Sequence, residues 1–338
     1  MLNLLRFWLR RWVERRKIIT RRERNQIFSF FCSIDFFASV YLLDFLWELD
    51  ILLFLCLRSA FILAIFMQSI LDKLYDRTSD DAISEILSLY DQGEAVVVNF
   101  LYFAVIASQN LFEDGEKTEK EKEYKKILLK SDFLLPDGIA LQLFYAFARL
   151  CGKVKSPHPY WLKNLNGTDF VPYFLSDLKK KYWSQKICLL LYWTRPEYLQ
   201  KAEDTLKFQW YNVIYSQDGY SDFDWEKADA ALEEYQDTIN VLLVARSTPK
   251  IPLQELWTSR NYQKIQQRKL LVFNTWGLLD FIAKVQSRAP KLWRTLKLER
   301  LYRLITDPKR NLKKVANSFL LFPYLFKYCL FWGAKKSS

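Results

Sequence analysis

The chain has 338 residues, of which 51% are hydrophobic and 17% aromatic, enough for one large domain or two modest ones with a full core. Its single histidine, His158, and its five widely spaced cysteines without a CxxC pair argue against a zinc site and a histidine-based catalytic triad. The net charge of +12 is uneven, with +7 in residues 1–25, +11 in residues 285–338 and −6 between them. The acidic middle argues against nucleic-acid binding, whereas basic ends rich in aromatic residues favour contact with an anionic lipid surface.

The amino-terminal region is basic and then strongly apolar. Residues 1–25 predict a basic helix on a membrane surface and not a secretory signal, because arginines fill the stretch ahead of the first apolar segment. Segments 27–47 and 51–71 are both long enough to span a bilayer, although two aspartates interrupt the first and Arg58 the second. Three interpretations therefore stay open for this pair: a membrane hairpin, two interfacial helices, or a helical extension packed on the body.

Two charged segments follow. Residues 78–92 predict a helix with an apolar face, for which Ser79 or Asp80 is a plausible cap. Residues 113–127 are rich in Glu and Lys and predict a solvated charged face or a loop, to which we attach no function.

Two buried strands carry one polar residue each. Residues 95–107 begin as a β-branched strand containing Asn99, a residue that also fits as the cap of a helix after the strand. Residues 133–135 predict a short strand, and Pro136 and Gly138 predict a tight turn into the helix of residues 139–150. Asp137 therefore stands at the carboxyl end of a strand, where open α/β sheets bind ligands, although an Asp before Gly is more often a cap or turn former.

The second half of the chain alternates between strands and helices. Thr168 and Asp169, after the loop that begins at residue 152, can cap the helix that follows them. Strands are then predicted at residues 186–193, 212–216, 238–246 and 269–275, and helices at residues 196–208, 224–236 and 253–265. Alternating apolar strands and helices predict an α/β fold with a mostly parallel, doubly wound (Rossmann-like) sheet.

Several short motifs occur in one order along residues 75–315. They are PDGIA from Pro136, Gly167-Thr168-Asp169, Pro249-Lys250 with Gln254-Glu255-Leu256-Trp257, Leu279-Asp280-Phe281, Arg288-Ala289-Pro290, and Leu301-Tyr302-Arg303-Leu304 with Asp307-Pro308-Lys309-Arg310. This ordered set resembles the WecG/TagA/CpsF family of glycosyltransferases. The family transfers an N-acetylmannosamine-type sugar from a UDP donor to a lipid-diphosphate-linked sugar at the cytoplasmic face of the membrane, in cell-surface polysaccharide or teichoic acid-type synthesis.

The resemblance implies roles for particular residues. Asp137 is expected to act as general base in an inverting, metal-independent reaction that uses no cofactor besides the UDP-sugar donor. Arg303 and Arg310 are expected to stabilise the departing diphosphate, because guanidinium groups neutralise its charge without a metal. The residues expected to line the substrate pocket are Asn99, Thr168, Asp169, Gln254 and Asp280.

The chain also departs from the family pattern. Aromatic and basic residues stand near three strand ends where family members carry glycines, namely Tyr192-Trp193, Arg246 and Trp276, and residues 251–253 are an apparent insertion. These departures motivate an alternative hypothesis, in which the protein is a non-catalytic, membrane-anchored scaffold with an altered donor pocket.

The expected organisation has three parts. Residues 1–74 are a helical membrane-associated extension, residues 75–290 the glycosyltransferase domain, and residues 291–338 a basic, helical, membrane-binding appendage. The expected partners are the UDP-sugar, a polyprenyl-diphosphate-linked sugar acceptor and an anionic membrane, with homo-oligomerisation left open. The expected location is the cytoplasmic face of the cell membrane, where the protein is peripheral or anchored by residues 27–71.

Overall fold

A computed structural model describes the α/β part of the chain. The described residues are 70–109, 111, 118–150, 154, 161–192, 194–245, 253–285, 290, 302, 305–306 and 321. The predictions for residues 1–69, and almost all of those for residues 291–338, lie outside the described residues. Within the described part, no helix is both long and apolar enough to cross a membrane.

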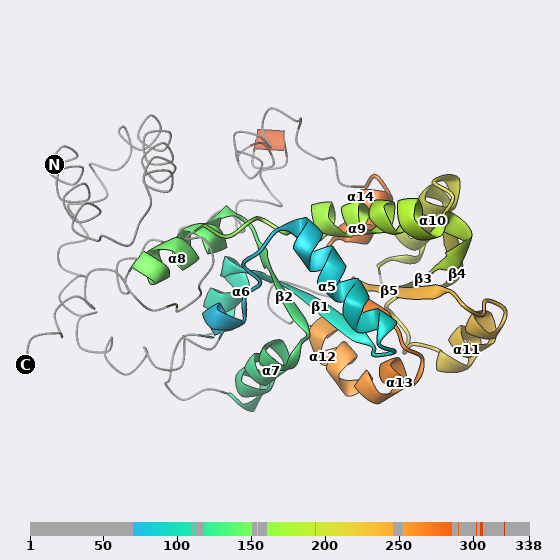
Figure 1. The fold of residues 1–338 in the computed structure, drawn as a ribbon, viewed down its shortest axis with the longest axis horizontal. Helices are drawn as coiled ribbons and strands as arrows, with labels where there is room; N and C mark the ends of the chain where they lie inside the picture. The colour runs from blue at the N-terminus through green and yellow to red at the C-terminus, as the bar shows by residue number, and fades with distance from the viewer. Residues whose placement is uncertain are drawn as a thin grey trace, which may run out of the picture. The chain divides into compact units, whose positions relative to one another are not determined.

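Six parallel strands form one sheet (Figure 1). Their order across the sheet is β2-β1-β6-β5-β3-β4, and every neighbouring pair is parallel. The strands are β1 (Val96–Tyr102), β2 (Phe133–Asp137), β3 (Ile187–Tyr192), β4 (Asn212–Gln217), β5 (Ile239–Val244) and β6 (Leu271–Asn274). This confirms the predicted Rossmann-like α/β fold, with a described sheet that is wholly parallel.

Helices cover both faces of the sheet (Figure 1). One face packs against α5 (Ser79–Asp91), α9 (Gly167–Tyr182), α10 (Pro196–Phe208) and α14 (Leu278–Ile282). The other packs against α7 (Glu119–Lys130), α11 (Trp225–Glu233), α12 (Leu253–Arg260) and α13 (Tyr262–Gln267). Next to β1 and β2, α6 (Phe103–Ser108) and α8 (Ile139–Leu150) add an apolar cluster. Connections between parallel strands are right-handed in nearly all proteins, so the direction in which the next strand is added determines which face its helix covers. Here strands are added in both directions across the sheet, and helices therefore cover both faces.

Capping residues explain where two helices begin. The N-cap of α5 is Thr78, not Ser79 or Asp80, because the Thr78 hydroxyl accepts from the Asp81 N–H while the Asp81 carboxylate accepts from the Thr78 N–H. The same capping box, made by Thr118 and Glu121, starts α7. Residues 119–127 are therefore helical, so the loop interpretation of this charged stretch is wrong. Tyr124 and Leu128 bury the inner face of α7, and most of its charged side chains lie outward, although Lys125 is buried.

Most strands enter the sheet through a residue with positive φ. Gly93 (φ 86°) precedes β1, Trp183 (φ 62°) precedes β3, and Trp210 (φ 64°) precedes β4. Asp237 and Lys269 do the same before β5 and β6. Glycine is the usual residue at such helix ends because a Cβ is strained there. With only eight glycines, this chain places side chains at four of these five positions.

We expect Gly93→Ala to destabilise the chain by about 1 kcal/mol, which is a fall in melting temperature of roughly 2–4 °C for a domain of this size. The cause is backbone strain at φ 86° and not a clash, because the nearest atom to the new Cβ would be Lys269 Nζ at 3.4 Å. Thermal unfolding in a neutral detergent measures the effect. Gly277→Ala is the control, because Gly277 has φ −146° and open space at its Cβ. An equal effect of the two substitutions would contradict the strain argument.

Candidate functional site

The carboxyl ends of β2, β1 and β6 bring a carboxylate next to two aromatic rings. Asp137 ends β2 and pairs in register with Tyr102, the last residue of β1. Trp276, two residues after β6, packs edge-on against the Tyr102 ring with the centroids 4.8 Å apart. All three side chains are half-buried, so each is shielded from bulk water without being sealed inside the core.

Backbone contacts hold the turn that carries Asp137. Gly138 has φ 88°, a conformation that favours glycine, and its N–H donates to Asn164 Oδ1 at 2.8 Å. The carbonyl of Pro136 accepts from the Leu165 N–H at 2.9 Å. The loop before α9 is thus bonded to the residues on both sides of Asp137, which fixes the backbone of Asp137 relative to the amino end of α9.

The amino end of α9 begins earlier than the sequence predicts. Asn166, not Thr168 or Asp169, is the N-cap, and its Oδ1 accepts from the Asp169 N–H at 3.0 Å. The Thr168 hydroxyl also donates to Asn166 Oδ1, at 2.7 Å, and the Asp169 carboxylate accepts from the Asn166 amide at 2.9 Å. A Cβ on Gly167 would lie 3.3 Å from the Phe100 ring, so glycine lets the helix approach β1 closely. Thr168 and Asp169 consequently lie in the first turn of a helix that starts beside Asp137.

A buried polar layer lies beneath α12. Asn99 is inside β1 and is only 1% exposed, so it is not a helix cap. Its Oδ1 accepts from Asn274 Nδ2 of β6 at 2.6 Å, and Asn274 Oδ1 accepts from the Thr258 hydroxyl of α12 at 2.9 Å. This chain of hydrogen bonds ties α12 to both strands near their carboxyl ends.

The first turn of α12 buries a second polar pair. Gln254 and Glu255 are both fully buried, and Gln254 Nε2 donates to Glu255 Oε1 at 3.0 Å. Gln254 Oε1 and Glu255 Oε2 have no hydrogen-bond partner among the described residues. Burial raises the pKa of the Glu255 carboxyl to about 7, although the hydrogen bond from Gln254 opposes that rise. Gln254 lies one helical turn before Thr258, the residue of α12 that bonds to Asn274.

Burial also affects Tyr124 of α7. Its phenol is fully buried, and burial, followed by the nearby Glu255 carboxyl, raises the pKa of Tyr124 well above its ordinary value. Tyr124 therefore remains a neutral hydroxyl group near Glu255 throughout the physiological pH range.

Asp280, another predicted site residue, lies at a different part of the sheet edge from Asp137. Asp280, on α14, accepts a hydrogen bond at 3.0 Å from Thr194, which follows β3. In the strand order, β3 is four spacings from β2, or on the order of 19 Å. Arg303 and Arg310 lie outside the described residues. Among the described residues, no group of His, Cys, Asp and Glu is placed to hold a metal ion.

Tyr192, which stands where family members carry a glycine, does not obstruct the carboxyl edge of the sheet. The Tyr192 ring is fully buried and packs against Phe223 and Trp257, with centroids 5.0 and 4.8 Å away. Its hydroxyl donates to the Ser221 carbonyl at 3.1 Å. Trp193 and Arg246 lie outside the described residues. The Tyr192 ring is therefore part of the core on the α11–α13 face and leaves the carboxyl edge free.

Sequence reasoning missed Tyr102 as a site residue and treated Trp276 only as a departure from the family pattern. Tyr102 ends an apolar strand, as Asp137 does, and Trp276 closely follows one. This position at a strand end was the signal in the sequence that could have identified them. Their proximity depends on strand order, because 35 residues separate Tyr102 from Asp137 in the chain while the two are directly paired in the sheet. A carboxylate beside aromatic rings can accept a proton from a hydroxyl group and hold a sugar ring against an apolar surface.

Stability should fall as pH rises from about 4.5 to about 7, because the folded state keeps Glu255 protonated over this range and the unfolded state does not. The shift corresponds to a loss on the order of 3 kcal/mol. Glu255→Gln keeps an acceptor for Gln254 but cannot ionise, so its melting temperature should lack this part of the pH dependence and exceed the wild-type value at pH 8. The exposed Glu197→Gln is the matched control. A wild-type pH slope in Glu255→Gln would contradict this assignment.

A comparison with protein families agrees with the fold and with the ordered motifs. The model of the glycosyl transferase family WecG/TagA/CpsF matches residues 69–335, which is well over half of the chain and includes the whole described sheet. The match confirms the resemblance that the sequence motifs suggest. The chain therefore belongs to the WecG/TagA/CpsF family of glycosyl transferases.

Proposed function

We propose that this protein transfers an N-acetylmannosamine-type sugar from a UDP donor to a polyprenyl-diphosphate-linked sugar, in the synthesis of a cell-surface polysaccharide or teichoic acid-type polymer. Family membership supports glycosyl transfer. The observation that carries the proposal is the position of Asp137 at the carboxyl end of β2, paired with Tyr102, whose ring packs against Trp276. Ligands of parallel α/β sheets bind at this edge.

Asp137 acts as the general base in this mechanism. Its carboxylate takes the proton of the acceptor hydroxyl while that oxygen attacks the anomeric carbon of the donor sugar. The bond between the anomeric carbon and the diphosphate oxygen breaks on the opposite face, and UDP leaves with the electron pair. This single displacement inverts the configuration at the anomeric carbon.

The surrounding residues hold the substrates in this scheme. The rings of Tyr102 and Trp276 provide an apolar surface for a sugar ring next to the base. Thr168 and Asp169 contribute from the first turn of α9. Asn99 and Gln254 are buried beneath the surface, where they bond to Asn274 and Glu255 and support the pocket from inside. Asp280 contributes from α14 at the more distant part of the edge.

Leaving-group stabilisation is assigned to arginines rather than to a metal. Arg303 and Arg310 would each donate hydrogen bonds to the diphosphate as its charge increases. The lipid-linked acceptor also gives the basic, aromatic chain ends a role, because anionic headgroups attract lysine and arginine. We therefore place the protein at the cytoplasmic face of the cell membrane, peripheral or anchored through residues 27–71.

Asp137→Asn should lower the turnover number by about 10²–10⁴-fold, because it removes the base but keeps the shape of the side chain. The Michaelis constant for the donor should change little. The measurement is transfer of labelled sugar from UDP-N-acetylmannosamine, with other UDP-sugars alongside, to a lipid-diphosphate-linked N-acetylglucosamine.

Asp91→Asn is the control for this experiment, since Asp91 is exposed at the far end of α5 and should leave turnover at the wild-type rate. Retention of full activity by Asp137→Asn would rule out Asp137 as the base. If the folded wild-type chain in lipid transferred sugar from none of the donors, the scaffold alternative would replace this proposal.

A further inference from the structure

The amino-terminal edge of the sheet exposes three large aromatic side chains. Trp183 is 81% exposed, Phe208 86% and Trp210 78%. Trp183 lies just before β3 and the other two just before β4, and these strands are neighbours. Lys179 Nζ bridges the two loops by donating to the Gln209 carbonyl at 2.7 Å. The three rings therefore belong to one surface, on the opposite edge from Asp137.

These rings contribute almost nothing to the stability of the isolated chain. Rings that are about four-fifths exposed remove little apolar surface from water. Trp183 and Trp210 also adopt positive φ, which is unfavourable for any residue with a Cβ. Clustered exposed aromatic residues on a folded domain usually mark a site of interaction with a partner.

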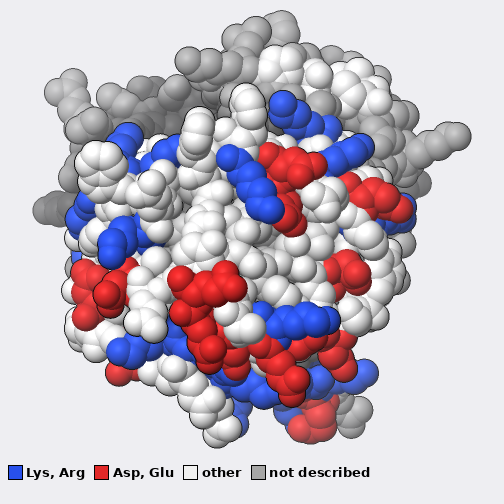
Figure 2. Space-filling view, turned by 90° about the vertical axis from the view of Figure 1, so that its right-hand side faces the viewer, with Lys and Arg blue, Asp and Glu red and all other residues white. Residues whose placement is uncertain are grey.

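The charges around the rings are divided into two halves. Residues 179–186 and 205–211 contain five lysines and no acidic residue. The adjoining end of α11 exposes Glu233, Glu234 and Asp237, and Lys186 Nζ donates to the Asp237 carbonyl at 3.2 Å, which places the halves side by side. Figure 2, which views the molecule from the side on which β4 and α11 lie in Figure 1, shows basic and acidic groups next to each other around an uncharged area.

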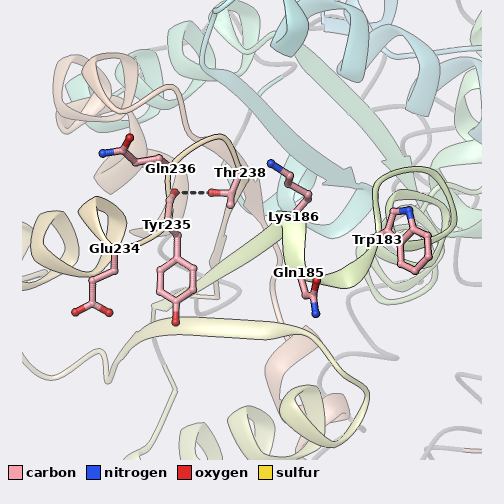
Figure 3. A pocket seen from close by; sticks show the side chains of 7 residues that line it. All are labelled: Trp183, Gln185, Lys186, Glu234, Tyr235, Gln236 and Thr238. Carbon is pink, nitrogen blue, oxygen red and sulfur yellow. Dashed lines mark hydrogen bonds between the residues drawn. The ribbon is translucent and has the colours of Figure 1, made fainter.

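A pocket of about 360 Å³ lies between the basic and acidic halves. Trp183 and Lys186 line one side, and Glu234 and Tyr235 line the other (Figure 3). The Thr238 hydroxyl donates to the Tyr235 carbonyl at 2.9 Å and fixes the loop after α11. The pocket has an aromatic wall and is open to a side chain from outside.

We propose that this edge binds the same edge of a second copy of the chain, in a two-fold symmetric dimer. A two-fold interface requires a self-complementary surface, and a basic half beside an acidic half meets that requirement when the copies face each other in opposite directions. An exposed ring of one copy then enters the pocket of the other, and the lysines of each copy meet the carboxylates of its partner.

The amount of apolar surface is adequate for such a contact. Six rings, three from each copy, would remove on the order of 1,000 Å² of accessible surface from water. With the surrounding lysines and glutamates, the total approaches the roughly 1,200 Å² of the smaller stable interfaces. The dimer leaves the edge with Asp137, Tyr102 and Trp276 free in both copies.

The charge pattern disfavours a membrane as the occupant. Anionic lipid would attract the lysines of residues 179–186 but repel Glu233, Glu234 and Asp237 next to them. A membrane bound here would also lie on the opposite edge from the candidate catalytic carboxylate. A second copy satisfies both halves of the surface at once.

The test is the molar mass of the full chain in an uncharged detergent, measured by sedimentation equilibrium with and without substitutions. The wild type should be a dimer. The dimer dissociation constant should rise at least tenfold in either of two double variants, Lys180→Glu with Lys181→Glu or Glu233→Lys with Glu234→Lys. Each double variant places like charges opposite one another at both symmetry-related contacts. An equimolar mixture of the two charge-reversed variants should restore the dimer, since opposite charges then meet at both contacts.

Trp210→Ser should weaken the dimer while the chain remains folded, whereas Tyr220→Ser, which changes a 74% exposed ring after β4, should leave the dimer dissociation constant at the wild-type value. A monomeric wild type at about 100 μM, or charge-reversed variants that dimerise as the wild type does, would overturn the proposal. So would a monomer that binds vesicles of phosphatidylserine and phosphatidylcholine and loses this binding in Lys180→Glu with Lys181→Glu.

Discussion

The described sheet depends on the pairing of β1 with β6. In the order β2-β1-β6-β5-β3-β4, this pair alone joins the first two strands to the other four. Asn99 and Asn274 reinforce the pair from inside, because a buried amide that lost its partner would remain without a hydrogen bond in the core. Thr258 extends the contact to α12, so the same hydrogen bonds position the helix that carries Gln254 and Glu255. One buried polar contact thus supports both the backbone pairing of β1 with β6 and the position of α12.

Parallel pairing also explains why distant segments meet. All strands point the same way, so their carboxyl ends lie on one edge, and the connections between them must cross back over a face. Asp137, Tyr102 and Trp276 come from three separate crossovers and meet only because β2, β1 and β6 are neighbours. The opposite edge collects the loops that follow the helices, and there the exposed rings gather. The candidate site and the surface proposed for self-association therefore lie at opposite ends of the strands.

The alternation of apolar strands and helices was enough to predict the sheet, because a parallel sheet buried on both faces leaves continuous apolar runs in the sequence. The helix at residues 196–208 matched α10 because Pro196 marks its first turn. The helical character of residues 119–127 was missed because the inward-facing Tyr124 and Leu128 are outnumbered by charged residues. Asp137 was placed correctly at the end of β2, but the pairing of Tyr102 with it required the strand order. The burial of Glu255 could not be predicted from the sequence, because it depends on how α7, α12 and the sheet pack together.

The positive-φ residues before β3, β4, β5 and β6 have a consequence for protein engineering. Trp183, Trp210, Asp237 and Lys269 occupy a conformation that costs a non-glycine residue roughly 1–2 kcal/mol, and all four lie at the edge away from Asp137. Lys269 is the most useful of the four, because it lies outside the surface proposed for self-association. Glycine at position 269 therefore offers a route to a more heat-resistant chain, because it relieves backbone strain at the edge away from the candidate site.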